Sequence, residues 1–151
     1  MDNNSLVDFL VVSNIAASSK EEVIKALVAN LEEKNYLYSK AVFLNDVLER
    51  ENTLSTYIGH EIGLPHSQSE GVKTPTVTVG RLAQPVKWTD EGDEVNTTFL
   101  ISVPKKNEDS LHLKILSKLA RLLMHESFRS EIRNIDEENL VEILNQKLRG
   151  A

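Results

Sequence analysis

The sequence predicts an α/β fold in which a mixed β-sheet is flanked by helices. Three observations carry this prediction: apolar residues recur at helical spacing in residues 20–50, β-forming residues dominate residues 74–103, and helical spacing returns from Asp109 onward. Helices on both sides of a block of strands favour layers packed on one sheet. At 151 residues, the chain is expected to form a single domain spanning residues 1–151.

The first helical pattern begins at a capping signal. Ser18 with Glu21 and Ser19 with Glu22 form two overlapping capping boxes, which would bind the free amide groups of a helix start. The pattern predicts an amphipathic helix that runs to about Lys34. Its apolar residues at helical spacing are Val23, Ile24, Leu27, Val28 and Leu31.

A second helix is expected to begin at Ser39, whose hydroxyl can cap it. Its buried side would consist of Val42, Phe43, Val47 and Leu48. Glu49 and Arg50 fall near its end, so Arg50 would leave a helix terminus just before a segment that contains two histidines.

The middle of the chain predicts strands. Residues 74–79 alternate small apolar and hydroxyl residues, and 86–88 and 97–103 are rich in β-formers. The acidic stretch 89–94 between them is expected to be a solvated hairpin end, because it lacks the ligand spacing of a calcium-binding EF-hand.

The last third predicts three helices. Asp109 or Ser110 can cap the first, Ser127 a short one over 128–133, and Asp136 the last, which would stop at Gly150. The apolar stripe of the first comprises Leu111, Ile115, Leu119, Leu122 and Leu123, and that of the last Leu140, Ile143, Leu144 and Leu148.

Composition excludes several classes of function. A net charge of −6 argues against nucleic acid as a partner, and the absence of cysteine excludes disulfides, thiolate chemistry and cysteine-bound zinc. The apolar run 9–12 follows Asp2 and Asp8, the wrong charge for a secretory signal, and no stretch approaches the ~18 apolar residues of a membrane span. We therefore expect a soluble, cytoplasmic protein without direct membrane insertion.

The most informative segment is residues 55–66, which ends in a histidine that follows a proline. Pro65 fixes its own φ and pushes Leu64 into an extended conformation, so His66 should be held rigidly. Gly59 and Gly63 flank a short expected strand and suggest a close approach to other groups. A positioned imidazole is a candidate nucleophile, general base or metal ligand.

The four histidines differ in their surroundings. His125 is expected at the end of a long helix, where an imidazolium would complement the helix dipole. His112 is expected in the first turn of that helix, where it could face an anion or lie at the edge of the apolar stripe. His60 and His66 lie six residues apart across the expected strand, a spacing that makes a metal site improbable.

Motifs for other chemistries are missing. There is no HExxH zinc motif, no Gly-x-Ser-x-Gly elbow, and no Walker or dinucleotide glycine motif. A hydrolase that uses His66 as base is a weak hypothesis, because no nucleophile accompanies it. We expect neither a metal nor a cofactor.

Residues 47–51, Ser55-Thr56 and the pattern Gly59-x-x-Ile62-x-Leu64-Pro65-His66 strongly resemble a known signature. It is that of the enzyme IIA domains of the fructose and mannitol class in the bacterial phosphoenolpyruvate-dependent sugar phosphotransferase system. The likeness continues, in order and spacing, through residues 111–120 and 128–129 and so covers nearly the whole chain.

The resemblance implies a fold and a site. The fold would be a mixed sheet flanked by helices. His66 would accept a phosphoryl group from phospho-HPr and pass it to an enzyme IIB, with His112 as the second active-site histidine and Arg50 beside the phosphate. Ser55 and Thr56 are candidate hydroxyl donors. Because the group moves between two proteins, we expect a shallow, exposed site ringed by apolar residues.

The chain also departs from the family pattern. His60, Glu61 and Gly63 stand where relatives usually carry Asn, Gly and Ala, and Ser67 replaces a glycine or alanine. These positions lie beside the expected site and leave the sugar and the partner open. A regulatory phosphorelay module of the same fold, of the nitrogen type, is the alternative to a transport component.

Overall fold

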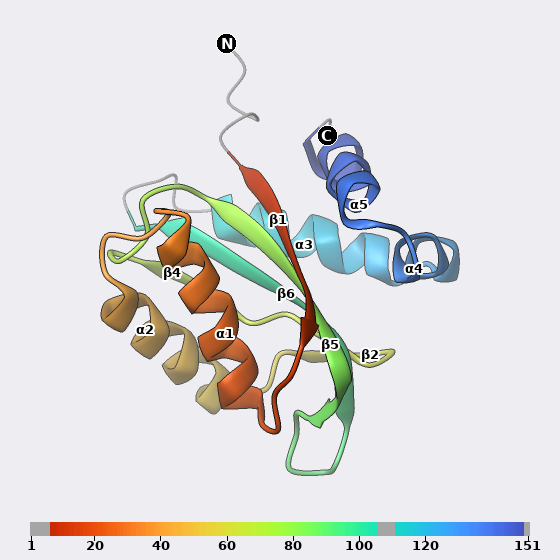
Figure 1. The fold of residues 1–151 in the computed structure, drawn as a ribbon, viewed down its shortest axis with the longest axis horizontal. Coiled ribbons are helices and arrows are strands. Elements are labelled where there is room, and N and C mark those ends of the chain that lie inside the picture. Colours follow the sequence, from red (N-terminus) through yellow and green to blue (C-terminus); the bar gives the residue numbers. More distant parts are fainter. Residues whose placement is uncertain (1–6, 106–110, 150–151) are drawn as a thin grey trace.

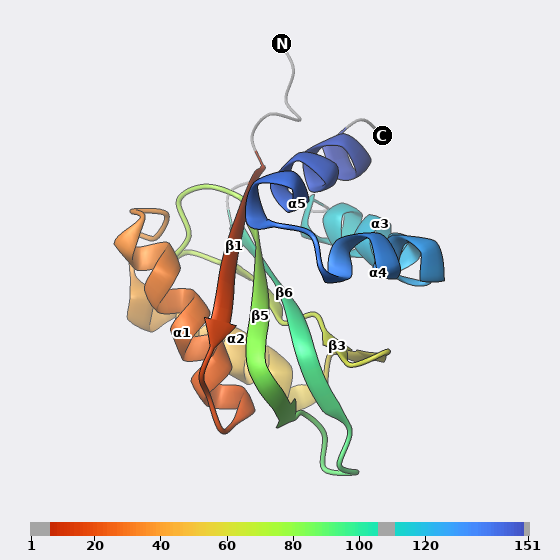
Figure 2. The same cartoon turned by 45° about the vertical axis from the view of Figure 1, so that its right-hand side comes forward.

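The computed structural model describes residues 7–105 and 111–149, without the side chains of His112 and Arg149. A sheet lies between two layers of helices, with α1 and α2 on one face and α3, α4 and α5 on the other (Figures 1 and 2). In chain order the elements are β1 (Asp8–Ile15), α1 (Lys20–Glu33), α2 (Lys40–Thr53), β2 (Tyr57–Gly59), β3 (Ile62–Gly63), β4 (His66–Ser69), β5 (Thr76–Lys87), β6 (Glu94–Pro104), α3 (Leu111–Leu123), α4 (Glu126–Arg133), α5 (Glu137–Leu144) and a π-helical turn η2 (Asn145–Arg149).

The sheet is mixed, as the sequence predicts. It has six strands in the order β1-β5-β6-β3-β2, and β4 also pairs with β6. β1 runs parallel to β5, β5 and β6 form an antiparallel hairpin, and β3 and β4 both run parallel to β6. β3 and β4 therefore follow one another along the same edge of β6, separated by Leu64 and Pro65.

Two details of the expected strands need correction. The apolar run 9–12 is not merely a short segment but part of β1, so a strand precedes the first helix. The expected strands at 74–79 and 86–88 belong largely to one strand, β5, with an irregularity between Arg81 and Val86. The hairpin end at 89–94 is confirmed, since the Trp88 amide donates to the Asp93 carbonyl at 2.7 Å.

One of the two capping boxes forms. The Ser19 hydroxyl accepts from the Glu22 amide at 3.2 Å, and the Glu22 carboxylate accepts from the Ser18 amide at 2.8 Å. The Ser18 hydroxyl donates to the same carboxylate at 3.1 Å. The hydrogen bonds from the Ser18 amide and hydroxyl hold the pKa of Glu22 below its ordinary value. Glu21 instead forms an ion pair with Lys25 at 3.2 Å.

The second helix begins as expected, with the Ser39 hydroxyl accepting from the Val42 amide at 3.1 Å. Its buried side differs from the prediction. Val42 is 43% exposed and Leu48 is half-buried, whereas Glu51 is buried together with Phe43 and Val47.

The C-terminal helices also differ in their starts. α4 begins at Glu126, one residue before the predicted cap Ser127, and the His125 carbonyl accepts from the Phe128 amide at 3.1 Å. His125 is thus the N-cap of α4 and not the last turn of α3. Asp136 is the N-cap of α5, although its side chain makes no capping hydrogen bond. The predicted caps Asp109 and Ser110 and the stop at Gly150 lie outside the described residues.

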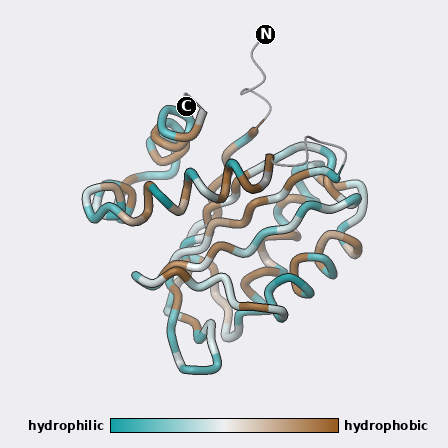
Figure 3. The backbone as a smooth tube through the Cα atoms, turned by 180° about the vertical axis from the view of Figure 1, so that it is seen from behind, coloured by the Kyte–Doolittle hydropathy of each residue, from teal (hydrophilic) through white to brown (hydrophobic). Residues whose placement is uncertain are grey.

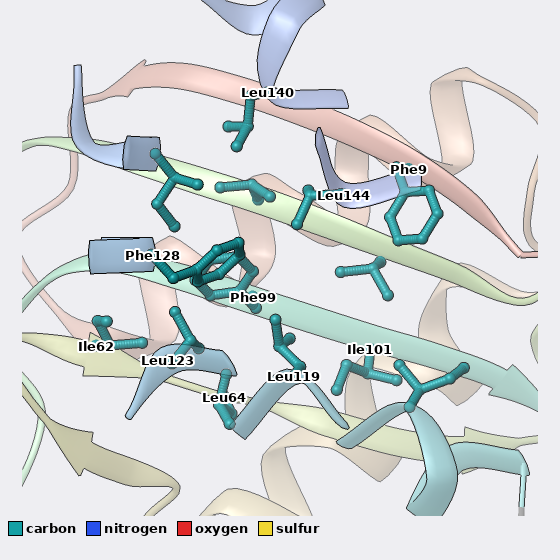
Figure 4. Packing of buried hydrophobic residues seen from close by; sticks show 14 of the residues in the cluster. Phe9, Ile62, Leu64, Phe99, Ile101, Leu119, Leu123, Phe128, Leu140 and Leu144 are labelled. Carbon is teal, nitrogen blue, oxygen red and sulfur yellow. The ribbon is translucent and has the colours of Figure 1, made fainter. Parts of the chain in front are cut away.

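Each face of the sheet has its own apolar core. On one face, α3, α4 and α5 pack on β5 and β6, and Figure 4 shows Leu64, Leu119, Leu123, Phe99 and Phe128 gathered there. Figure 3 shows hydrophobic stretches recurring along α3 between polar ones, as expected for a helix with one buried side. The other core lies under α1 and α2. No helix within residues 7–105 and 111–149 is long and apolar enough to span a membrane.

Gly63 is required by a close approach. A Cβ at this position would lie 2.8 Å from Cε2 of Trp88. Trp88 is only 2% exposed, so its ring has little room to move away. The indole ring thus occupies the space that a side chain at position 63 would need.

We expect Gly63→Ala to lower the free energy of unfolding by about 1–3 kcal/mol, because the added methyl overpacks the indole ring. Trp88→Leu removes that clash, so the same substitution should cost much less in the Trp88→Leu background. Urea unfolding of the two single variants and the double variant measures the coupling. Strictly additive effects would contradict the packing explanation.

Candidate functional site

His66 is the first residue of β4, the short strand that pairs with β6. It pairs in register with Ile101, which belongs to the core under α3, so the imidazole faces the α3 side of the sheet. The residue is 8% exposed. The expectation of a shallow, exposed site is therefore wrong for the histidine itself, which is largely buried.

A hydrogen bond to the backbone fixes the tautomer of the imidazole. Nδ1 of His66 lies 2.8 Å from the Leu64 carbonyl oxygen. A carbonyl oxygen can only accept, so Nδ1 carries the proton, and in the neutral ring Nε2 then holds the lone pair. A nucleophilic reaction of this ring would therefore use Nε2, and the ring cannot rotate without losing this bond.

The Leu64-Pro65 pair that precedes His66 is anchored on both sides. The Leu64 side chain is 2% exposed in the core under α3, and its amide donates to the Thr56 carbonyl at 3.1 Å. The Pro65 carbonyl accepts from the Ile101 amide at 3.0 Å. Because Pro65 also fixes its own φ, the carbonyl that binds His66 has very little freedom.

The buried carboxylate of Glu51 holds Thr56 in place. Glu51, in the last turn of α2, is 2% exposed and accepts from the Thr56 amide at 2.9 Å and from the Thr56 hydroxyl at 2.7 Å. Lys20 at the start of α1 lies 3.3 Å from the same carboxylate. A continuous set of contacts thus runs from α1 through Glu51, Thr56 and Leu64 to His66.

These contacts correct the expected role of the Thr56 hydroxyl, whereas the role of the Ser55 hydroxyl stays a prediction. The Thr56 proton is donated to Glu51, so this hydroxyl cannot also donate to a phosphoryl group. The Ser55 hydroxyl accepts from the Tyr57 amide at 3.2 Å. Both side chains shape the loop between α2 and β2.

Sequence reasoning missed Glu51, although a signal for it exists. Phe43, Val47 and Glu51 recur every four residues, so a carboxylate stands on the buried stripe of an otherwise amphipathic helix. A charged group is placed there only if partners satisfy it. The partners, Lys20 and Thr56, could not be identified from spacing alone.

Arg50 lies beside the strand that carries His66. Its Nη1 donates to the Leu54 carbonyl at 2.8 Å, which fixes the guanidinium at the end of α2. Arg50, Ser67 and Gln68 line a polar cavity of about 280 Å³, together with Asp46, Glu49, Thr53 and Lys105. The structure therefore brings Arg50 beside Ser67 and Gln68 of β4, whereas His66 does not line this cavity, and it adds Lys105 as a second cation there.

His112 lies in the first turn of α3, as predicted, on the helix that covers the face toward which His66 points. Its side chain is outside the described residues. Two large apolar side chains are exposed on the elements that supply these residues: Leu113, next to His112, is 54% exposed, and Leu54, bound by Arg50, is 69% exposed.

The other histidines stand apart from His66. His60 is exposed at the tip of the turn between β2 and β3, so the expected strand between His60 and His66 is in fact a turn and the two-residue strand β3. His125 is exposed before α4. Across the described ranges, no group of three His, Asp or Glu side chains is placed to hold a metal ion.

Comparison with known proteins connects this geometry to a family. The model of the phosphoenolpyruvate-dependent sugar phosphotransferase system EIIA 2 family matches residues 6–147. The chain belongs to this family. The fructose-like EIIA component of Escherichia coli strain K12 is 30% identical over 136 residues, which cover 89% of this chain and 91% of that protein.

Solved structures of enzyme IIA proteins share the fold. The nitrogen regulatory protein IIA-Ntr from Neisseria meningitidis has 27% identity and a TM-score of 0.76, covering 93% of this chain and 97% of its own. The mannitol IIA of Escherichia coli, solved in complex with phosphorylated enzyme IIB, has 20% identity and a TM-score of 0.62, covering 100% of this chain and 98% of its own.

The family membership sets the type of chemistry. An enzyme IIA domain is a phosphotransferase component that carries the phosphoryl group on a histidine, and this chain is such a phosphocarrier. It also matches longer proteins: it spans about 14% of the length of the multiphosphoryl transfer proteins among its relatives.

We expect Glu51→Gln to lower the free energy of unfolding by about 1–3 kcal/mol, because an amide cannot accept both hydrogen bonds from Thr56. Phosphorylation of the folded variant by a reconstituted phosphotransferase system should also be slower, since the loop that carries Leu64 loses its anchor. Chemical unfolding and the rate of radiolabel incorporation measure the two effects. Glu33→Gln, which makes the same change at an exposed glutamate of α1 away from the cavity that Arg50 lines, is the matched control. Equal labelling rates for the two variants would show that Glu51 does not position the site.

Proposed function

We propose that His66 is the phosphorylated residue of this chain, that it receives the phosphoryl group from phospho-HPr, and that it delivers the group to an enzyme IIB during sugar uptake. The chain would act as one enzyme IIA domain on the cytoplasmic side of the membrane. The observation that supports this most strongly is the 2.8 Å hydrogen bond from Nδ1 of His66 to the Leu64 carbonyl, because it leaves Nε2 as the nucleophile.

The transfer needs little more than position and charge. The Nε2 lone pair attacks phosphorus in line, the N–P bond of the donor breaks, and its electron pair returns to the donor's imidazole. As the N–P bond forms, positive charge develops on the His66 ring. The Leu64 carbonyl accepts a hydrogen bond from Nδ1–H, and this hydrogen bond becomes stronger as the ring becomes positive. It therefore stabilises the transition state more than it stabilises the neutral imidazole.

Arg50 is proposed to bind the phosphoryl oxygens. A guanidinium is planar, permanently charged and shaped for two oxygens at once. One of its N–H groups binds the Leu54 carbonyl at 2.8 Å, which leaves the other donors for the ligand. His112 is proposed as the second contact, from a helix first turn where free amides and the helix dipole also favour an anion.

The partner surface would surround this site. Exposed Leu54 and Leu113 extend from the two elements that supply Arg50 and His112 and offer apolar area for a docked protein to cover. The cavity beside β4 also contains the acidic Asp46 and Glu49, which would favour a donor that presents basic residues.

A regulatory output is the second candidate. It is favoured by one observation, the similarity to the Neisseria nitrogen regulatory protein IIA-Ntr over 93% of this chain. In that case the same histidine would be phosphorylated, and the phosphorylation state would control binding to another protein instead of transfer to an enzyme IIB.

Incubation with phosphoenolpyruvate, enzyme I and HPr should give an acid-labile mass gain of one phosphate, because phosphohistidine is hydrolysed in acid. The gain should be lost in His66→Ala and retained in His125→Ala, a control histidine that is exposed at the start of α4. Intact-protein mass spectrometry makes the measurement. An unmodified wild-type chain, under conditions that label a control enzyme IIA, would refute the proposal.

The same labelled chain distinguishes the two outputs. Mixed with candidate enzyme IIB proteins, a transport component should lose its phosphate to one of them. Retention of the phosphate with every IIB of the host, together with binding of another protein that depends on it, would favour the regulatory module.

A further inference from the structure

A second polar pocket lies away from His66, between the β2–β3 turn and α4. The described residues that line it are His60, Ile62, Val79, Arg81, Asn96, Thr97, Arg129, Ile132, Arg133 and Leu140. Figure 1 labels α4 and β4 at opposite ends of the molecule, and both Figure 1 and Figure 2 show the β2–β3 turn projecting on the α4 side. The pocket is therefore separate from the proposed phosphorylation site.

The charge of this pocket is unusual for the protein. The chain has a net charge of −6, yet Arg81, Arg129 and Arg133 meet here and no Asp or Glu of the described residues lines the pocket. None of these arginines takes part in the ion pairs found within the described ranges. Their positive charge is thus not neutralised by a carboxylate of the described chain.

Two of the guanidinium groups are held in place. Arg81 donates to the Ile132 carbonyl at 2.9 Å, and Arg129 donates to the Leu123 carbonyl at 2.7 Å. Each of these bonds uses one of five N–H donors, so most donors remain for a ligand. Fixing the groups in advance reduces the entropy lost when an anion binds.

The turn that supplies His60 has a fixed backbone conformation. His60 and Glu61 have φ values of 57° and 62°, as the two central residues of a tight hairpin turn require. The turn is held against β6, since the Glu61 carbonyl accepts from the Asn96 amide at 2.9 Å and its carboxylate accepts from the Asn96 side chain. The turn thus places His60 at the edge of the arginine pocket.

The size of the pocket limits its ligand. Its volume of about 30 Å³ has room for roughly two waters. One carboxylate or a few phosphate oxygens could enter, while the rest of the ligand stays outside. Ile62, Val79, Ile132 and Leu140 supply apolar contacts there.

We propose that this pocket binds the oxyanion group of a small metabolite, a phosphate monoester or a carboxylate, independently of phosphorylation at His66. Both groups match the fork of a guanidinium, and the arginines supply that fork from two elements of the fold. Arg133, which is exposed and makes no hydrogen bond in the described structure, is free to close on the bound group.

The test is an NMR titration of the intact chain with inorganic phosphate, a hexose phosphate and succinate in parallel. We expect saturable amide shifts centred on His60, Asn96, Thr97 and α4, and the tightest of the three probes identifies the class of metabolite. Arg133→Gln should weaken binding about tenfold through loss of a charge-assisted hydrogen bond. His66→Ala should bind as wild type does.

Arg121→Gln is the matched control, since it removes the same charge from an exposed arginine of α3 that does not line the pocket. Equal binding by Arg133→Gln and Arg121→Gln would overturn the proposal, because binding would then depend only on the net charge of the protein. So would the absence of saturable shifts with all three probes, or shifts that centre on Ser67 and disappear in His66→Ala. None of these outcomes bears on phosphorylation of His66, which is tested separately by mass.

Discussion

The hydrogen bond between Nδ1 of His66 and the Leu64 carbonyl is the interaction on which the proposed chemistry depends. It is buried, and it joins two residues that are only two positions apart in the chain. In a free histidine the two tautomers interconvert, and either nitrogen could react. Here the carbonyl selects one tautomer and one ring orientation, so the protein specifies the reactive atom with a backbone group that no side-chain substitution can remove directly.

Contacts from several elements of the fold restrain the Leu64 carbonyl. Leu64 is fixed by the core under α3, by β6 through Pro65, and by Thr56, which in turn is fixed by Glu51 and Lys20. The site therefore lies where both helical layers meet one sheet edge. The Lys20 ammonium also lies over the Trp88 ring, 5.6 Å from its centroid, and Trp88 packs on Gly63. Lys20 thus contacts both Glu51 and the residue that packs next to Leu64.

Much of this arrangement could be predicted from the sequence, and the rest could not for identifiable reasons. The mixed sheet, the caps Ser19 and Ser39 and the position of Arg50 depend on local patterns that the structure keeps. Burial of His66 depends on its pairing with Ile101, and the charge of Glu51 is satisfied by Lys20, so both depend on residues distant in sequence. The Thr56 partner of Glu51 is close in sequence, but it lies past the end of α2, where helical spacing no longer applies. Ser127 is not the cap because α4 begins two residues earlier than predicted, after the N-cap His125, a choice that local propensity does not decide.

The most direct test of the central claim is the identity of the phosphorylated nitrogen. Long-range ¹⁵N–¹H NMR of the phosphorylated chain distinguishes Nε2-phosphohistidine from Nδ1-phosphohistidine. Because the Leu64 carbonyl holds the proton on Nδ1, we predict that the phosphoryl group is on Nε2 of His66, with Nδ1 still protonated. A phosphoryl group on Nδ1, which would require the hydrogen bond to Leu64 to be broken, would contradict this account.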